Sequence, residues 1–146
     1  MLIGIDRRMP PALLHCLALM GHGDEIVVAD ANFPSGSTAR HCVVQEAIAL
    51  AGLDAPAAIE LITDLMPLDG FFDYSALRMQ IDNEPDTTGD VHNDAWHILK
   101  KRLPKNGILS SIERQAFYAQ ANEAFAVVRT CEVRAYGCFI LRKGVV

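Results

Sequence analysis

Apolar residues at regular spacing predict a helix and then a strand at the start of the chain. The apolar face of this helix consists of Leu13, Leu14, Leu17 and Met20. Pro10 and Pro11 suit its first turn, where a missing N–H costs nothing. We expect the helix to end at Gly21 and Gly23, because glycine accepts the left-handed conformation of a C-cap. Residues 26–29 follow as a short buried strand.

The rest of the chain continues the same alternation. Helical periodicity predicts further helices at residues 55–66, 91–103 and 114–125. Apolar runs predict strands at residues 77–81, 126–129 and 138–141. Polar loops are expected at residues 32–37 and 84–90, whereas residues 41–45 fit either a strand or the start of a helix. Helices that alternate with strands predict an α/β fold, here a compact α/β sandwich.

The composition narrows the class of protein. The 146 residues suit one domain over residues 1–146, and a share of 51% hydrophobic against 21% charged residues is globular. A formal net charge of −5 without a basic stripe argues against a nucleic-acid partner. The mean hydropathy of +0.17 is high for a small monomer, so we expect surplus apolar surface to form subunit contacts in a homo-oligomer.

Neither a membrane partner nor secretion is predicted. No apolar run approaches the roughly 18 residues of a membrane span, and the N-terminal residues carry charges where a signal peptide needs its apolar stretch. We therefore expect a cytoplasmic protein. Its four cysteines form no C-x-x-C pair, which favours free thiols that mostly fill the core.

Two residues beside the first strand are candidates for chemistry. His22 stands between two glycines where the first helix gives way to the strand, and histidine both gives and takes a proton near neutral pH. The alternative is a charged histidine that caps the helix C-terminus. Asp30 ends the strand, where ligands gather in α/β proteins and a carboxylate can accept sugar hydroxyls. Its alternative role is an Asx-turn or N-cap in the following loop.

Four further residues are weaker candidates by pattern alone. Arg114 and Tyr118 are four positions apart and share a helical face, a pairing that is also common on ordinary protein surfaces. Asp69 is a turn carboxylate, and Met79 stands on a strand where methionine is usually core.

No cofactor is predicted. His92 and His97 are five positions apart and do not share one helical face as an i,i+4 pair would, so we interpret them as solvated or structural and predict no metal. A phosphate-binding glycine loop and a G-x-S-x-G elbow are both absent from the sequence, which disfavours nucleotide-dependent and α/β-hydrolase chemistry.

Motifs along nearly the whole chain carry a family resemblance. They include Met20-Gly21-His22-Gly23-Asp24-Glu25, Ala29-Asp30-Ala31-Asn32-Phe33-Pro34, Leu68-Asp69, Ile112-Glu113-Arg114, Phe117-Tyr118, Tyr136-Gly137 and Leu141-Arg142-Lys143-Gly144-Val145. In this order they resemble the D-ribose pyranase / L-fucose mutarotase family. The resemblance implies an RbsD-like α/β sandwich that assembles into an oligomeric ring, typically a homodecamer, with sites completed across subunits. It also implies an isomerase that interconverts the anomers of a free monosaccharide without a cofactor.

The resemblance assigns roles by position. It implies His22 as the proton donor, with Tyr118 or Asp69 as a second proton carrier that acts directly or through water. The residues implied to bind the sugar are Asp30, Met79, Arg114, Tyr136 and Cys138. Asp30, Arg114 and Tyr136 would orient hydroxyls, and Met79 would present an apolar wall.

Position 138 departs from the family pattern and leaves the choice of sugar open. The family has asparagine after Tyr-Gly, whereas Cys138 stands here, and a thiol donates and accepts hydrogen bonds poorly. The Met-Gly-His-Gly-Asp and Leu-Arg-Lys-Gly-Val motifs resemble the fucose branch, so we expect L-fucose or a related sugar. The alternatives are pyranose–furanose exchange of D-ribose, a non-catalytic monosaccharide-binding accessory protein and a purely structural oligomer.

Overall fold

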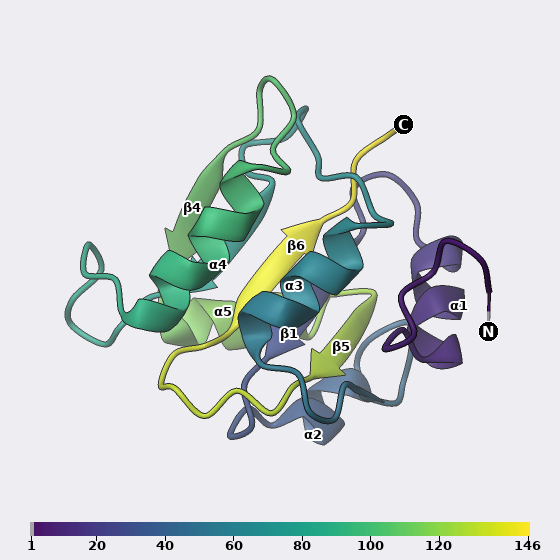
Figure 1. Ribbon diagram of the computed structural model, residues 1–146. Coiled ribbons are helices and arrows are strands. Elements are labelled where there is room, and N and C mark those ends of the chain that lie inside the picture. The colour runs from purple at the N-terminus through teal and green to yellow at the C-terminus, as the bar shows by residue number, and fades with distance from the viewer. Residues whose placement is uncertain (1) are drawn as a thin grey trace.

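A six-stranded mixed sheet organises the protein in a computed structural model, which describes residues 2–146 (Figure 1). Its strands are β1 (Glu25–Ala29), β2 (Ile48–Ala49), β3 (Ala76–Met79), β4 (Leu109–Ile112), β5 (Ala126–Arg129) and β6 (Phe139–Arg142), in the order β2-β5-β1-β6-β3-β4. The helices are α1 (Pro11–Leu19), α2 (Ser35–Ala39), α3 (Ala55–Thr63), α4 (Asp90–Lys100) and α5 (Arg114–Ala121).

The strand directions define two opposite ends of the strands, which we call edges of the sheet. β1 is parallel to β5, β5 to β2, and β3 to β4, whereas β6 is antiparallel to both β1 and β3. Within residues 2–146, five strands therefore run one way and β6 runs against them. We call the edge where β1, β3 and β4 end the carboxyl edge, and the edge where they begin the amino edge. β6 starts at the carboxyl edge and finishes at the amino edge.

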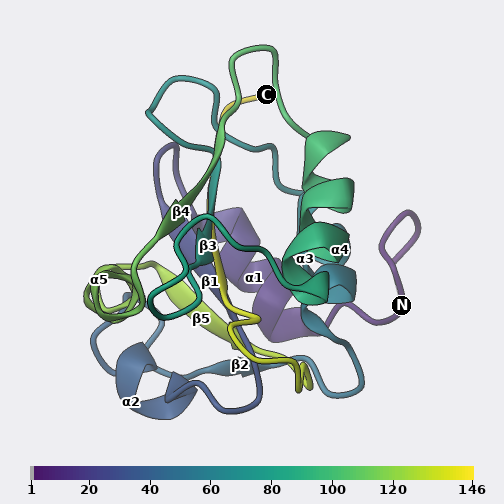
Figure 2. The same cartoon turned by 90° about the vertical axis from the view of Figure 1, so that its left-hand side faces the viewer.

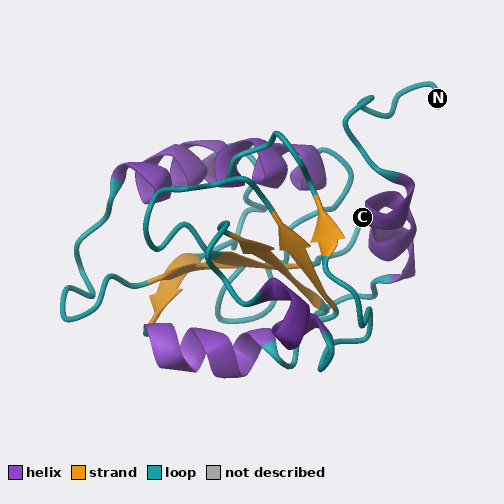
Figure 3. Cartoon of the chain, turned by 90° about the horizontal axis from the view of Figure 1, so that it is seen from below, coloured by secondary structure: helices purple, strands orange, loops and turns teal. Residues whose placement is uncertain are grey.

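Helices cover both faces of the sheet, so the strands are buried on both sides (Figures 2 and 3). α3 and α4 lie on one face, and α2 and α5 lie on the other. Ile26 and Val28 of β1 join the core beneath α3 and α4, whereas Val27 and Ala29 pack in the second core with Phe117 of α5. This two-sided burial explains the continuous apolar run of β1 and confirms the predicted mixed α/β architecture.

The first helix ends differently from the prediction. Helix α1 stops at Leu19, and its C-cap, Met20, has an extended backbone with ψ of 139°. The Lys143 ammonium donates to the carbonyls of Leu17 and Met20, at 2.9 and 2.6 Å, and so satisfies groups that a glycine cap would otherwise serve. Gly23 instead takes φ of +88° in the turn that enters β1. The predicted glycine C-cap is therefore wrong.

Other boundaries shift because tertiary contacts decide where periodic segments end. The three later helices are confirmed but stop at Thr63, Lys100 and Ala121. Helix α2 begins inside the segment predicted as a loop, and residues 41–45 form turns and bends, neither strand nor helix. The short strands β2 and β4 were not predicted: β2 has two residues, and β4 has the sequence LSSI, without an apolar run.

The four thiols are free, as expected. Cys16, Cys42 and Cys138 are buried, and Cys131 is exposed. None of the helices within residues 2–146 has the length and apolar character needed to cross a membrane.

Candidate active site

A pocket of about 350 Å³ opens at the carboxyl edge of the sheet. It brings together six residues that the sequence singled out, namely Asp30, Met79, Arg114, Tyr118, Tyr136 and Cys138. They come from the ends of β1 and β3, from α5 after β4, and from the segment that enters β6. Since these chain segments meet at one edge, residues more than 100 positions apart in sequence become neighbours. Four residues that the sequence did not single out complete the lining: Asn32, Phe33, Asp82 and Ala135.

Asp30 is held by the loop that follows β1. Its Oδ1 accepts hydrogen bonds from the backbone N–H groups of Asn32 (3.0 Å) and Phe33 (2.9 Å). This is the Asx-turn considered as the alternative role for Asp30. Asp30 nevertheless lines the pocket, and the turn engages only one of its two carboxylate oxygens. Turn formation and ligand binding are therefore compatible at this residue.

Cys138 lies directly against Asp30. Its Sγ accepts a hydrogen bond from the Asp30 backbone N–H at 3.4 Å, and the residue is 1% exposed. Burial, together with the negative charge of Asp30, raises the pKa of the Cys138 thiol well above its ordinary value. The group is thus a protonated thiol at neutral pH, and it offers only weak hydrogen bonds at this position.

A buried histidine fixes the backbone at Tyr136. Tyr136 has φ of 60°, a left-handed conformation that is uncommon for an aromatic residue. Its carbonyl lies 2.9 Å from Nε2 of His92, and Nδ1 of His92 accepts a hydrogen bond from the Gly89 backbone N–H at 3.1 Å. Burial lowers the pKa of His92, so the ring is neutral and carries its proton on Nε2. His92 is therefore structural, which is one of the two interpretations that the sequence allowed, whereas His97 is exposed.

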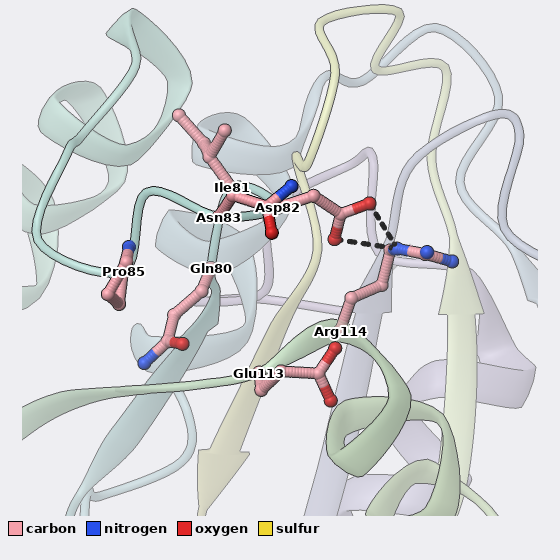
Figure 4. A pocket seen from close by; sticks show the side chains of 7 residues that line it. All are labelled: Gln80, Ile81, Asp82, Asn83, Pro85, Glu113 and Arg114. Carbon is pink, nitrogen blue, oxygen red and sulfur yellow. Dashed lines mark hydrogen bonds and ion pairs between the residues drawn. The ribbon is translucent and has the colours of Figure 1, made fainter.

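Arg114 and Tyr118 form one wall of the pocket. The Arg114 guanidinium carbon lies 5.9 Å from the centre of the Tyr118 ring, which in turn packs 5.4 Å from Phe33. Nε of Arg114 donates to both oxygens of Asp82, at 2.9 and 3.0 Å. Asp82 also lines an adjoining cavity of about 460 Å³ that shares Arg114 (Figure 4). Its position, three residues beyond Met79 at the carboxyl end of a strand, was the available signal in the sequence.

His22 and Asp69 lie together at the amino edge. The turn that carries His22 is fixed by Asp24, whose Oδ2 accepts from the Gly21 N–H at 2.7 Å, and by Gly23, whose N–H donates to the Lys143 carbonyl at 2.9 Å. Nε2 of His22 lies 2.8 Å from Oδ1 of Asp69. The His22 side chain is 39% exposed, and that of Asp69 is fully buried.

Asp69 is an ionised, fully engaged carboxylate. Its Oδ2 accepts hydrogen bonds from the backbone N–H groups of Phe71 (3.0 Å) and Phe72 (2.7 Å). Burial alone would raise the pKa of Asp69, but the hydrogen bonds from Phe72, His22 and Phe71 outweigh it and lower the pKa below its usual value of 3.8. An ionised carboxylate only accepts hydrogen bonds, so Nε2 of His22 carries the proton that faces it. Asp69 thus fixes the His22 ring through Nε2 and leaves Nδ1 outside this contact.

Aromatic side chains surround this histidine. The rings of Phe71 and Phe72 lie 5.4 and 5.5 Å from the His22 ring. Phe71 is 75% exposed, and Phe72 stacks at 4.8 Å under the Arg142 guanidinium. The amino edge therefore presents an exposed apolar patch with a proton-carrying imidazole at its centre.

The eight predicted site residues thus form two groups, separated by the length of a strand. The five residues of β1 lie between His22 and Asp30, a span of about 16 Å at about 3.3 Å per residue. Within one copy of the chain, His22 therefore does not lie beside Asp30 and Tyr118, and the expectation of sites completed across subunits stays a prediction. Asp69 accompanies His22 and does not line the pocket.

The mixed sheet and its polar carboxyl-edge pocket define an α/β protein suited to a small polyhydroxylated ligand. The chain belongs to the RbsD / FucU transport protein family, whose model matches residues 3–146. This membership confirms the resemblance inferred from the motifs.

Individual relatives place the chain within that family. It is 41% identical over 145 residues to the fucose mutarotase of Homo sapiens, and the match covers 97% of this chain and 92% of the relative. The structure of FucU from Bifidobacterium longum superposes with a TM-score of 0.88 at 32% identity, covering 98% of this chain and 99% of the other. The fucose mutarotase of Streptococcus pneumoniae in complex with L-fucose has a TM-score of 0.85 at 33% identity, covering 99% of both chains.

Proposed function

We propose that this protein is an L-fucose mutarotase, an isomerase that interconverts the anomers of the free sugar. The observation that carries the proposal is that one pocket at the carboxyl edge contains all six of the candidate residues named above that come from the ends of the strands and from α5. The likeness to a fucose mutarotase in complex with L-fucose, over 99% of both chains, supports the choice of sugar.

The pocket offers the groups that a neutral aldose requires. The Asp30 carboxylate accepts sugar hydroxyls, Arg114 donates to their oxygens, and Tyr118 and Tyr136 do either through their phenols. Met79 supplies an apolar wall against which the C6 methyl group of fucose packs. A deoxysugar with one methyl group and several hydroxyls matches this mixture of polar and apolar surface.

Ring opening requires one proton to reach the ring oxygen while another leaves the anomeric hydroxyl, with the roles reversed on closing. His22 is our candidate for the main proton carrier, because its side chain is 39% exposed and imidazole side chains in general exchange protons near neutral pH. Asp69 holds the ring and its tautomer, as the carboxylate of a catalytic triad does, and is too fully engaged to shuttle protons itself. Tyr118, which lines the pocket, is the better second carrier.

Two copies of the chain are needed to unite these groups. We place the His22–Asp69 amino edge of one copy against the carboxyl-edge pocket of the next, with the exposed Phe71 and Phe72 providing apolar contact surface. Such a contact joins unlike surfaces, and repeated unlike contacts that close generate a ring. This arrangement supports the homodecameric ring that the family resemblance implies, built from single-domain subunits. The cytoplasmic location stays a prediction.

Magnetisation-transfer NMR on a panel of L-fucose, D-galactose, D-ribose and L-rhamnose tests the proposed activity. We expect anomer exchange above the buffer rate to be fastest for L-fucose. Faster pyranose–furanose exchange of D-ribose would replace the proposal with the pyranase alternative. Sugar binding at a buffer-level exchange rate would replace it with a non-catalytic binding protein.

Mixed assemblies test the shared site. His22→Ala and Arg114→Ala each inactivate a different half of the proposed site, so neither variant should be active alone. When both are co-expressed at equal levels, about a quarter of the sites pair two unmodified halves if subunits mix at random, and activity should return to that extent. Mixed assemblies that stay inactive, although native mass spectrometry shows both chains in one particle, would refute the shared site.

A further inference from the structure

We propose that Asp82 positions Arg114 and masks its charge, so that the carboxyl-edge pocket accepts neutral sugars and rejects phosphorylated ones. The inference rests on the proposed function and deepens it by assigning Asp82 as the residue that orients Arg114 and sets the selectivity against anionic sugars.

The geometry of the pair is specific. One nitrogen of Arg114, Nε, donates to both carboxylate oxygens of Asp82, at 2.9 and 3.0 Å. Figure 4 shows the two terminal nitrogens on the far side of the guanidinium, pointing away from Asp82. The ion pair therefore fixes the plane of the guanidinium through its inner nitrogen and leaves the outer nitrogens as donors for a ligand.

Local structure holds both partners in place. Asp82 stands in a tight turn closed by a hydrogen bond from the Glu84 N–H to the Ile81 carbonyl (3.0 Å), with Asn83 left-handed at φ of 64°. Arg114 is the first residue of α5, whose N-terminus is capped by the Glu113 carboxylate. Asparagine is one of the few non-glycine residues that adopt the left-handed region readily, so this turn is a stable local structure. The turn therefore sets where the Asp82 carboxylate can lie.

The charge balance of the pocket follows from this pair. Its lining contains two carboxylates, Asp30 and Asp82, and one guanidinium, Arg114. Because Asp82 already pairs with Arg114, the local charge that a phosphate would meet is that of Asp30, which repels an anion. A neutral sugar hydroxyl needs only a directed hydrogen-bond donor and acceptor. The Asp82–Arg114 pair keeps the outer Arg114 nitrogens as donors and leaves the Asp30 carboxylate as acceptor. Within the described lining, no other basic side chain offsets this balance.

The test compares Asp82→Asn with Asp64→Asn, a matched control in which Asp64 pairs with Arg102 on the surface away from the pocket. The probes are L-fucose, whose exchange is followed by NMR, and inorganic phosphate as inhibitor at constant ionic strength. Both Asp82 and Arg114 side chains are about one-third exposed (38% and 34%), and exposed ion pairs contribute little to folding, so the variants should fold.

We expect phosphate to leave exchange by the unmodified protein and Asp64→Asn unchanged, and to inhibit Asp82→Asn. We also expect the KM for L-fucose to rise about 10-fold in Asp82→Asn, with a smaller change in kcat, because one donor loses its fixed orientation. Adding Arg114→Gln to Asp82→Asn should abolish phosphate binding, measured by direct titration of phosphate into the folded double variant, since the unmasked guanidinium is its source.

Equal phosphate inhibition of the unmodified protein and Asp82→Asn, or an unchanged KM in Asp82→Asn, would overturn the inference. Failure of the proposed function gives a different result, namely no L-fucose exchange by the unmodified protein. Direct titration of phosphate into each variant then still tests the masking: binding only to Asp82→Asn supports it, and the same affinity for all variants refutes it.

Discussion

The Nε2 atom of His22 lies 2.8 Å from Oδ1 of Asp69, and this contact joins an exposed imidazole to a fully buried carboxylate. The backbone N–H groups of Phe71 and Phe72 hold the carboxylate from the opposite side. The fixed acceptor orients the histidine ring, while the His22 side chain stays 39% exposed. The first two predictions follow from this arrangement.

Replacement of His22 by alanine should lower the rate of L-fucose anomer exchange by about 100-fold or more, because general acid–base catalysis typically contributes at least this factor. Because the side chain is exposed, the variant should fold, and circular dichroism checks this. His97→Ala, which removes an exposed histidine from α4, is the matched control and should exchange at the unmodified rate. A folded His22→Ala protein with undiminished exchange would end the proposed role.

Replacement of Asp69 by asparagine should destabilise the protein by about 1–3 kcal/mol, because one of the two buried acceptor oxygens becomes an NH2 donor and its hydrogen bonds are lost. The pKa of Asp69 is lowered on folding, so its contribution is complete above the usual value of 3.8 and disappears as the pH falls through the lowered pKa. Urea unfolding across the acidic range should show the gap between the two proteins closing at low pH. A gap independent of pH would contradict the ionised state assigned to Asp69.

Replacement of His92 by leucine should also lower the free energy of unfolding, by about 1–3 kcal/mol at neutral pH, because the Tyr136 carbonyl and the Gly89 N–H lose their partner. Burial lowers the pKa of His92 from 6.5, so folding favours the neutral ring. Its contribution is complete above pH 6.5 and is lost as the pH falls through the lowered pKa, which narrows the difference from the variant.

The same variant should raise the KM for L-fucose, since Tyr136 would leave its left-handed conformation. His97→Leu serves as the control for both measurements. An unchanged KM in a folded His92→Leu protein would show that the ring does not position Tyr136.

Replacement of Cys138 by asparagine should tighten L-fucose binding by about 5- to 10-fold, because an amide donates and accepts hydrogen bonds where the thiol does so poorly. The introduced amide oxygen would also be able to accept the Asp30 N–H that Sγ now accepts. Isothermal titration with L-fucose measures the change, and Cys42→Ser, at a thiol outside the pocket, is the control. Weaker binding by a folded variant would indicate that the pocket is adapted to the thiol.

Strong periodicity made most of the fold predictable. The interior strands β1, β5 and β6 are continuous apolar runs because helices cover both of their faces. β4 is the outermost strand of the sheet and has partly exposed serines. It therefore lacks the apolar run on which strand prediction depends. α2 consists of SGSTA, in which serine, glycine and threonine are poor helix formers, so packing against the sheet and not local propensity accounts for this helix.

The sequence indicated which residues are candidates for the site, but not how they divide between the two edges of the sheet. Motifs identified all eight residues, but their division between two edges depends on which strands pair and in which direction. His22 and Asp30 are close in sequence, yet the extended β1 places them at opposite ends. Conversely, Cys138 meets Asp30 because β6 runs antiparallel to β1, a pairing that no local pattern encodes. Asp82 escaped notice because its partner, Arg114, is 32 positions away.

The single reversed strand ties the two edges to one another. β6 is bonded to β1 on one side and to β3 on the other, with Val28 opposite Phe139 and Glu25 opposite Arg142. A shift of the β6 register by one residue would displace Cys138 from the pocket and Arg142 from Phe72 together. It would also move every side chain between them to the opposite face of the sheet. Insertions or deletions within β6 should therefore be far less tolerated than in the surface turn at residues 101–108. The length and register of the four-residue strand β6 therefore fix the positions of residues at both the carboxyl edge and the amino edge.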